Sequence, residues 1–327
     1  MKTNIFIIHD GITNSIFYSQ ILKPFKNKAL QNPNNKFMLI SFETSNPKIQ
    51  LDLPNNLTIK ILKKSLFQSI NKFRLKKILL SPSNIVARGP IAGWLALKTG
   101  FKSVTVQARG ILTEEYQLTH SEDTGVKKIL TKLRAAYYRN IERYVYSNQQ
   151  IKIEAVSGAL KQFLHTKYNA NLNNISIANL DIPQTIEPAQ LVKWKQEVRT
   201  SLGFKSDDHI ICYSGSIRPW QHPKDIIPFL KNKLAEQPNT KLLILTQGQK
   251  EFKKFLDKEK VDKNNYKITT SKPTEIYKYL AAANIGAIYR NKHIVNWVSR
   301  PTKALEYKAA GLKVIHNGTV DFLNKLF

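Results

Sequence analysis

The chain has 327 residues, of which 42% are hydrophobic and 10% aromatic. That is enough to bury the cores of about two ordinary domains, and it excludes a globally disordered protein. Lys and Arg number 51 against 23 Asp and Glu, a net charge of +28 that points to an anionic partner. The single cysteine, Cys212, excludes an intrachain disulfide and a cysteine-based zinc site, and it fits a reducing compartment.

Several kinds of anionic partner would satisfy this charge. Nucleic acid, a phosphate-rich substrate and anionic lipid each gain from counterion release or from an attractive surface potential. A lysine-rich surface that only solvates the protein is the alternative. The apolar run Ile5–Ile8 is too short for a secretory signal, and no run approaches the roughly 20 apolar residues that cross a bilayer. We therefore expect any membrane association to be peripheral.

Short β-branched runs alternate with longer amphipathic segments, a pattern typical of strand–helix units around parallel sheets. The fold class is therefore α/β. In the first half we expect helices between strands at Asn4–Asp10, Lys36–Phe42, Leu57–Leu62, Asn84–Arg88, Ser103–Arg109, Lys152–Ser157 and Ile175–Asn179.

The longest predicted helix runs from about Val126 to Tyr146 and carries one apolar stripe, with its Lys and Arg residues largely on other faces. We expect the stripe to pack against the core and the basic back to be solvated. The stripe consists of Val126, Ile129, Leu130, Leu133, Tyr137, Ile141, Tyr144 and Val145.

The segment Asp181–Pro188 lacks periodicity and is bracketed by prolines, so it predicts a linker between domains 1–181 and 182–327. We expect two Rossmann-like domains facing a cleft, with ligands beyond the carboxyl ends of the strands. In the second domain, strands at His209–Tyr213, Lys241–Thr246, Tyr266–Thr270, Ile285–Tyr289 and Lys313–His316 alternate with helices at Lys224–Leu234, Glu251–Glu259, Thr274–Ala282 and Thr302–Ala310.

The segment Ser299–Ile315 is the most informative one. Pro301 suits a first helical turn, Ser299 or Thr302 suits a cap, and Gly311 suits the helix exit before a strand. Amides at such a helix start form an anion site ready for a diphosphate, and Glu306, about one turn inside, can accept hydrogen bonds from ribose hydroxyls. Any capped helix between two strands shares these features, so a purely structural helix is an equal alternative.

This segment resembles the retaining GT-B glycosyltransferases of family 4, in which Pro-Thr-Lys, Glu-Tyr, Ala-Ala-Gly and Val-Ile recur at the last helix–strand step of the second domain. The resemblance implies that Glu306 holds the donor ribose. The family often has a second Glu eight positions earlier, where this chain has Val298, so the donor sugar stays open. By the same resemblance, the donor diphosphate falls to Ser299, Arg300, Pro301, Thr302 and Lys303.

A second donor-side motif follows the first strand of the second domain. Gly215 and Ser216 resemble the family's glycine turn, which lets the diphosphate approach the backbone, and Arg218 would supply a cation. A small turn before a proline is the alternative. We expect the base near the strand at Ile285 and the loop Thr246–Gly248.

The first domain offers loops that are similar to the acceptor side of family members. Two Arg-Gly turns follow predicted strands, and their arginines could bind phosphate, while two neighbouring glutamates could bind acceptor hydroxyls. Ion pairs that merely hold the loops are the alternative. The predicted acceptor residues are Asp10, Gly11, Arg88, Gly89, Arg109, Gly110, Glu114 and Glu115.

The resemblance implies a glycosyltransferase that moves a sugar from a nucleotide-sugar to a lipid-linked or growing surface-polysaccharide acceptor, with retained anomeric configuration. It implies no cofactor and no metal, because Arg218, Lys303 and helix amides would neutralise the leaving diphosphate. It identifies no catalytic residue. We expect an anionic membrane surface as a further partner, and a cytoplasmic location at the inner face of the cytoplasmic membrane.

Two other functions stay open. One is a non-catalytic basic protein that binds polyanions or nucleic acid through Rossmann-like lobes, although we do not expect nucleic acid as the partner. The other is a relative that keeps the nucleotide site without turnover. Because the family continues past its last strand with helices that return to the first domain, the end at Phe327 leads us to expect a truncated carboxyl terminus.

Overall fold

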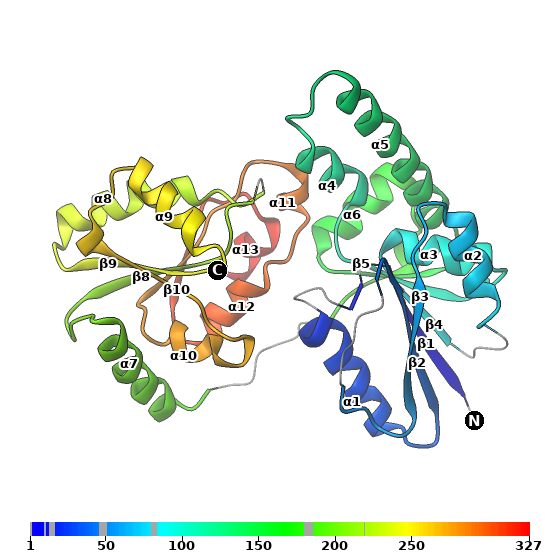
Figure 1. The fold of residues 1–327 in the computed structure, drawn as a ribbon, viewed down its shortest axis with the longest axis horizontal. Helices are drawn as coiled ribbons and strands as arrows, with labels where there is room; N and C mark the ends of the chain where they lie inside the picture. Colours follow the sequence, from blue (N-terminus) through cyan, green and yellow to red (C-terminus); the bar gives the residue numbers. More distant parts are fainter. Residues whose placement is uncertain are drawn as a thin grey trace. The chain divides into compact units, whose positions relative to one another are not determined.

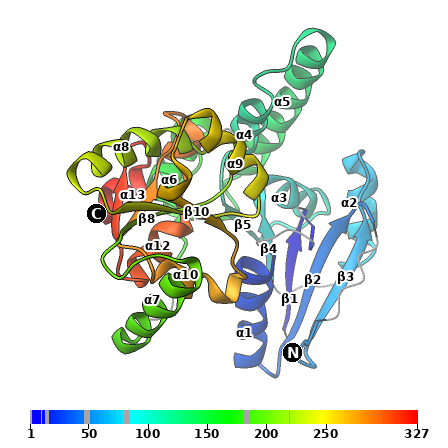
Figure 2. The same cartoon turned by 60° about the vertical axis from the view of Figure 1, so that its left-hand side comes forward.

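The computed structural model describes residues 2–9, 11–12, 17–45, 51–79, 84–179, 186–218 and 220–327. The chain forms two compact units, Met1–Ala178 and Asn179–Phe327. Each is a parallel sheet with helices packed on it (Figures 1 and 2). The predicted domain boundary at 181/182 lies outside the described residues.

The first unit contains seven parallel strands in the order β3-β2-β1-β4-β5-β6-β7. All seven predicted strands are confirmed, with ends shifted by at most two residues. They are β1 (Thr3–Ile8), β2 (Lys36–Glu43), β3 (Leu57–Lys63), β4 (Asn84–Arg88), β5 (Val104–Ala108), β6 (Lys152–Ala155) and β7 (Ile175–Ile177). The helices are α1 (Lys23–Gln31), α2 (Gln68–Lys76), α3 (Gly89–Lys98), α4 (Leu112–Thr119), α5 (Gly125–Tyr146) and α6 (Gly158–Tyr168).

The second unit contains five parallel strands in the order β10-β9-β8-β11-β12. Its five predicted strands are confirmed as β8 (His209–Ser214), β9 (Thr240–Leu245), β10 (Tyr266–Thr269), β11 (Ile285–Ile288) and β12 (Lys313–His316). The helices are α7 (Pro188–Leu202), α8 (Ile226–Glu236), α9 (Gln249–Lys258), α10 (Ile276–Leu280), α11 (Ile294–Trp297), α12 (Thr302–Ala309) and α13 (Asp321–Leu326). The sequence did not predict α7, α11 or α13.

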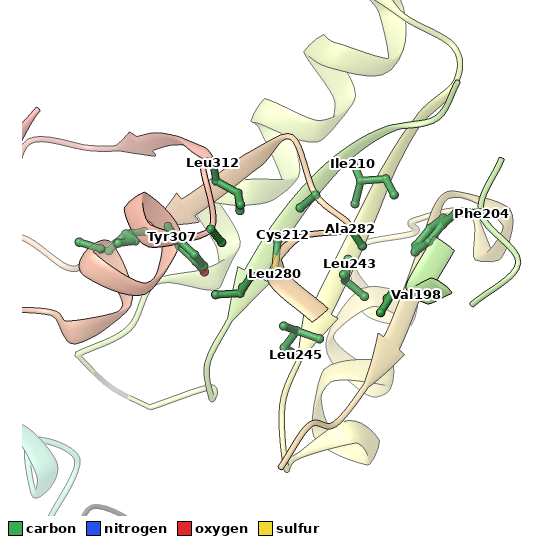
Figure 3. Close-up of a cluster of buried hydrophobic side chains, with 14 of the residues drawn as sticks. Val198, Phe204, Ile210, Cys212, Leu243, Leu245, Leu280, Ala282, Tyr307 and Leu312 are labelled. Atoms are coloured by element: carbon green, nitrogen blue, oxygen red, sulfur yellow. The ribbon is translucent and has the colours of Figure 1, made fainter. Parts of the chain in front are cut away.

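The core of the second unit fixes β8, β11 and α12 against one another (Figure 3). The fully buried Tyr307 of α12 accepts a hydrogen bond through its hydroxyl from the backbone N–H of Ser214, at 2.9 Å. Its ring lies against Gly286 of β11, where a Cβ would come within 2.4 Å of the ring. Burial raises the pKa of the Cys212 thiol, which makes this side chain a packing group and not a nucleophile.

The predicted orientation of α5 is wrong for most of its apolar stripe. Only Ile141 and Val145 are buried, whereas the other stripe residues, Val126, Ile129, Leu130, Leu133, Tyr137 and Tyr144, are exposed. The reason is Glu142 on the opposite face, which accepts hydrogen bonds from the Leu112 N–H at 2.8 Å and the Tyr168 hydroxyl at 2.9 Å. This buried carboxyl group caps α4, and together with the buried Ala135, Val145 and Tyr146 it fixes the side of α5 that faces the unit.

No helix within the described residues combines the length and the apolar character that crossing a lipid bilayer requires.

Candidate functional site

The centre of the second sheet is a topological switch point. From β8 the strand order runs outward through β9 to β10, and from the adjacent β11 it runs the other way to β12. In open parallel sheets, ligands bind beyond the carboxyl ends of the strands at such a point. A ligand site is therefore expected at the turn after β8 and at the residues after β11.

The turn after β8 is held by one carboxamide. The Oε1 atom of Gln221 accepts hydrogen bonds from the Ser216 N–H at 2.8 Å and from the Tyr213 hydroxyl at 3.1 Å. A Cβ on Gly215 would lie 2.7 Å from this oxygen and 2.8 Å from the Nζ atom of Lys303. The turn thus brings bare backbone against an ammonium group, and glycine is needed for that close approach.

Two cations meet at this edge of the sheet. Burial and the neighbouring guanidinium of Arg290 lower the pKa of Lys303 to about 8, while Glu306 acts in the opposite direction. Burial also lowers the pKa of Arg290, whose Nε is buried without a hydrogen-bond partner among the described residues. Burial disfavours the protonated, charged form of both side chains. A bound anion next to them would stabilise those charged forms.

Glu306 lies on α12, and its charge acts both on Lys303 and on Tyr277 of α10. Burial raises the pKa of its carboxyl group, and Lys303 opposes that effect. Burial and the negative charge of Glu306 raise the pKa of Tyr277 on α10 to about 12, which places the two side chains near each other. The carboxylate can accept hydrogen bonds from ligand hydroxyl groups next to the cation pair.

The start of α12 differs from its prediction. The helix begins at Thr302, and Pro301 occupies the cap position in an extended conformation without a side-chain cap, so the prediction of a first-turn Pro301 capped by Ser299 or Thr302 is wrong. The Ser299 hydroxyl donates instead to the Asn296 carbonyl, at 2.8 Å. A helix start leaves its first amides without carbonyl partners in the helix, so the backbone here still suits an anion. The predicted exit at Gly311, with φ +74°, is confirmed.

Two other predicted donor-side residues, Arg218 and Arg300, have contacts outside this cluster. Arg218 is exposed, with its guanidinium 6.0 Å from the centroid of the Trp220 ring. Arg300 donates to the Asn179 carbonyl, at 3.3 Å. Val298 is fully buried, so it serves packing at the position where a second Glu would stand in the resembled family.

In the first unit, Gly11 lies just past β1 and Arg88 is the last residue of β4, and these two strands are neighbours at that sheet's own switch point. Gly11 has φ +83°, and a Cβ there would lie 2.8 Å from the Glu43 carboxylate, which also accepts from the Ile12 N–H at 2.6 Å. The buried Arg88 donates to the Gln20 carboxamide at 2.9 Å. Gly89, the first residue of α3, has φ +79°. Asp10 lies outside the described residues.

The remaining acceptor candidates hold their own loops together. Glu114 forms an ion pair with Lys167 of α6, and Glu115 accepts from the Ile111 N–H at 3.3 Å while filling the space beside Gly110. Arg109 lies 3.5 Å from the Glu154 carboxylate. Their binding of an acceptor stays a prediction.

Sequence reasoning missed three residues beside these loops and turns. Gln221 was not distinguished from other turn residues. His9 directly follows β1 and Arg290 lies two residues past the end of β11, and a position just past a strand was the signal that could have identified them. His9 is buried, and burial together with the charges of Lys64 and Arg134 lowers its pKa to about 3. Among the described residues, no group of three or more His, Cys, Asp or Glu is placed to hold a metal ion.

No protein-family model matches the sequence, and no curated protein matches it. Solved structures do share its fold. WaaG, a glycosyltransferase involved in lipopolysaccharide biosynthesis, aligns with a TM-score of 0.68 at 14% identity, over 99% of this chain and 83% of its own. The UDP-forming α,α-trehalose-phosphate synthase of Burkholderia vietnamiensis gives 0.62 at 9% identity, over 99% and 86%. A Listeria monocytogenes protein assigned as a UDP-N-acetylglucosamine 2-epimerase gives 0.55 at 9% identity, over 100% and 82%.

These similarities establish the fold. Two units, each with a parallel sheet of Rossmann-like topology, make up the GT-B fold that the glycosyltransferases share. The predicted fold class is confirmed. Because a protein assigned as an epimerase shares this fold, the fold alone does not determine the reaction.

Proposed function

We propose that the chain is a glycosyltransferase that transfers a sugar from a nucleotide-sugar to a lipid-linked or growing surface-polysaccharide acceptor, with retention of anomeric configuration. The observation that carries the proposal is the Lys303 ammonium against the bare backbone of Gly215, with the Arg290 guanidinium as a neighbouring cation, at the switch point of the second unit. A diphosphate matches this arrangement in charge and in position. Glu306 beside the pair suits the hydroxyls of the attached ribose.

The same groups suit the chemistry of transfer. When the bond between the anomeric carbon and the diphosphate breaks, negative charge grows on the leaving oxygen. Lys303, Arg290 and the amides at the start of α12 stabilise that charge, the role we propose they play in place of a metal ion. The acceptor oxygen bonds to the anomeric carbon on the face that the diphosphate leaves, and the hydroxyl proton passes to the departing phosphate. The enzyme contributes by positioning both partners.

We further propose that the protein acts at the inner face of the cytoplasmic membrane, because a net charge of +28 favours an anionic surface next to a lipid-linked acceptor. The first test is turnover. The full chain is incubated with UDP-, GDP- and CMP-sugars and with membranes that contain glycolipid acceptors, and free nucleotide is measured. Saturable, acceptor-dependent release with sugar incorporated into lipid supports transfer. Salt-sensitive binding of DNA or RNA without release, or interconversion of the sugar alone, would exclude it.

Binding of a nucleoside diphosphate is expected to weaken as the pH rises through 8. Below about pH 8 Lys303 is protonated with or without ligand. Above about pH 8 Lys303 loses its proton in the empty site, whereas a bound diphosphate keeps it protonated. The apparent dissociation constant should therefore rise about tenfold between pH 7 and pH 9 in equilibrium dialysis. The control is Lys303→Arg, whose guanidinium stays charged and should remove this dependence. An equal slope in the two proteins would show that another group titrates.

Gly215→Ala is expected to weaken diphosphate binding about tenfold or more with only a small loss of stability. The new Cβ would meet the ends of two flexible side chains, Gln221 and Lys303, which can move away, and it would lie 3.2 Å from the ring of Tyr213, which has to shift by a few tenths of an ångström. That movement displaces the Lys303 ammonium and the Gln221 carboxamide that holds the turn. Gly158→Ala, at a position where a Cβ meets nothing within 4 Å, is the matched control. Unchanged binding by Gly215→Ala would mean that the ligand does not approach this turn.

A further inference from the structure

The outer face of α5 carries an apolar stripe with no protein packed over it within the described residues. Val126 is 73% exposed and Leu133 63%, and Ile129 and Leu130 between them are similarly exposed. On a helix of 3.6 residues per turn these four side chains share one face. Further along the same face stand the exposed Tyr137 and Tyr144, and the Lys98 ammonium lies 4.0 Å from the centroid of the Tyr144 ring. A contiguous apolar surface of this kind marks an interaction site.

The flanks of this stripe are basic and lack acidic residues. No Asp or Glu occurs between Asp123 and Glu142. Exposed cations stand on both sides of the stripe, namely Lys127, Lys128, Lys132 and Arg134. The face therefore combines aliphatic side chains with positive charge, and it complements a surface that is apolar inside and anionic outside.

A second element of the same unit has the same character. Leu66 and Phe67, just before α2, are 80% and 71% exposed, and Phe73 of α2 is also exposed, with the Lys77 ammonium 4.5 Å from its ring centroid. The chain has no Asp or Glu between Asp52 and Glu114. The basic residues around these apolar ones are Lys63, Lys64, Lys72, Arg74, Lys76 and Lys77.

The two elements lie around one end of the sheet. At the carboxyl end of β1, His9 lies 3.5 Å from Gln68 of α2, and its backbone carbonyl accepts from Lys64 at 2.8 Å. Arg134 of α5 is close enough for its charge to act on the same imidazole. Figures 1 and 2 both show α2 and the projecting first half of α5 at the end of the first unit where β1, β2 and β3 terminate.

We propose that the outer face of α5 and the Leu66–Lys77 segment together dock the first unit on an anionic phospholipid bilayer. The aliphatic and phenylalanine side chains enter the boundary between headgroups and acyl chains, the tyrosines lie at headgroup level, and the lysines meet lipid phosphates. Nucleic acid fits this surface less well, since exposed Val, Ile and Leu gain nothing from a phosphate backbone.

This inference rests on the proposed function and deepens it, because it identifies the surface that would bring the enzyme to a membrane-anchored acceptor. The docking surface lies at the end of the sheet where β1 and β4 terminate, and the predicted acceptor residues Gly11 and Arg88 stand at the same end. Docking would therefore present those loops to an acceptor that is anchored in the same bilayer.

The test is co-sedimentation of the full chain with phosphatidylcholine vesicles, with and without roughly a third of phosphatidylglycerol. We expect binding to the anionic vesicles, and partial release at high salt. The double variant Leu130→Ser/Leu133→Ser should lower the partition coefficient about a hundredfold, since two inserted aliphatic side chains are lost. The matched control is Leu30→Ser, because Leu30 is 57% exposed on α1 of the same unit but lies outside the docking surface.

A second variant measures insertion directly. Leu133→Trp, at an exposed position, should give a blue-shifted emission that brominated lipids quench. Solution binding of nucleoside diphosphate should be unchanged in every variant, which separates failure of this proposal from failure of the proposed function. Wild-type protein that stays in the supernatant with anionic vesicles, or a double variant that sediments like the wild type, would overturn the proposal. So would association with DNA or an acidic protein in place of vesicles.

Discussion

Replacing Lys303 by Met is expected to lower turnover about a thousandfold, because it removes a fixed cation from the leaving diphosphate. Methionine keeps most of the length and apolar packing of the lysine stem, so the fold should survive. Arg290→Met should act in the same direction through the second cation of the pair. Steady-state assays of nucleotide release measure both variants. Lys308→Met is the control, since Lys308 is exposed on the same helix.

Lys303→Met should also change how the free energy of unfolding depends on pH. The folded chain holds the Lys303 proton less tightly than the unfolded chain, because its pKa is lowered from 10.5 to about 8. This group therefore lowers stability below pH 8, and wild-type stability gains as the pH rises from there toward 10.5. In urea titrations, Lys303→Met should not show this rise in stability with pH, and at neutral pH it should be at least as stable as the wild type. Turnover within a few fold of wild type, in a folded Lys303→Met protein, would remove this residue from the mechanism.

Gly286→Ala is expected to destabilise the second unit by about 3 kcal/mol or more. The added Cβ would lie 2.4 and 2.5 Å from the Cδ2 and Cγ atoms of Tyr307. The ring has no free space to move into, since Tyr307 is fully buried and its hydroxyl is bound to the Ser214 N–H. Urea-induced unfolding measures the loss.

A double variant tests the cause. Tyr307→Leu makes room at the same place, so Gly286→Ala should cost much less in that background, as a double-mutant cycle would show. Additive effects of the two changes would mean that the glycine is needed for another reason. Because Tyr307 adjoins Glu306 and Ser214 adjoins Gly215 in sequence, this packing also aligns the two halves of the site.

Much of the fold could be predicted from sequence because buried parallel strands leave a strong signal. The run Ile210–Tyr213 and its counterparts are continuously apolar, and helix exits such as Gly311 need a left-handed backbone. The direction of α5 could not be predicted in this way, since an apolar stripe fits a core and a membrane equally well. The deciding residue, Glu142, is polar, and its partners at Leu112 and Tyr168 lie far away in sequence.

The site was predictable where its residues belong to a local motif. Lys303 and Glu306 share one helix with the recognisable Ala-Ala-Gly exit. Arg290 belongs to no motif, and only the sheet order brings it beside Lys303. For the loop glutamates, the residue type suggested a ligand-binding role, but sequence could not show their partners within the protein. Glu114 has the chemistry of a hydroxyl-binding carboxylate, but its partner Lys167 stands 53 residues away and occupies it.

The most direct test of the central claim is a crystal structure of the protein with a bound nucleoside diphosphate. We expect phosphate oxygens between the Gly215 backbone, the first amides of α12 and the Lys303 ammonium, with the guanidinium of Arg290 nearby and the ribose hydroxyls on Glu306. A nucleotide bound elsewhere in the second unit, with Lys303 and Glu306 paired only to protein groups, would contradict the account.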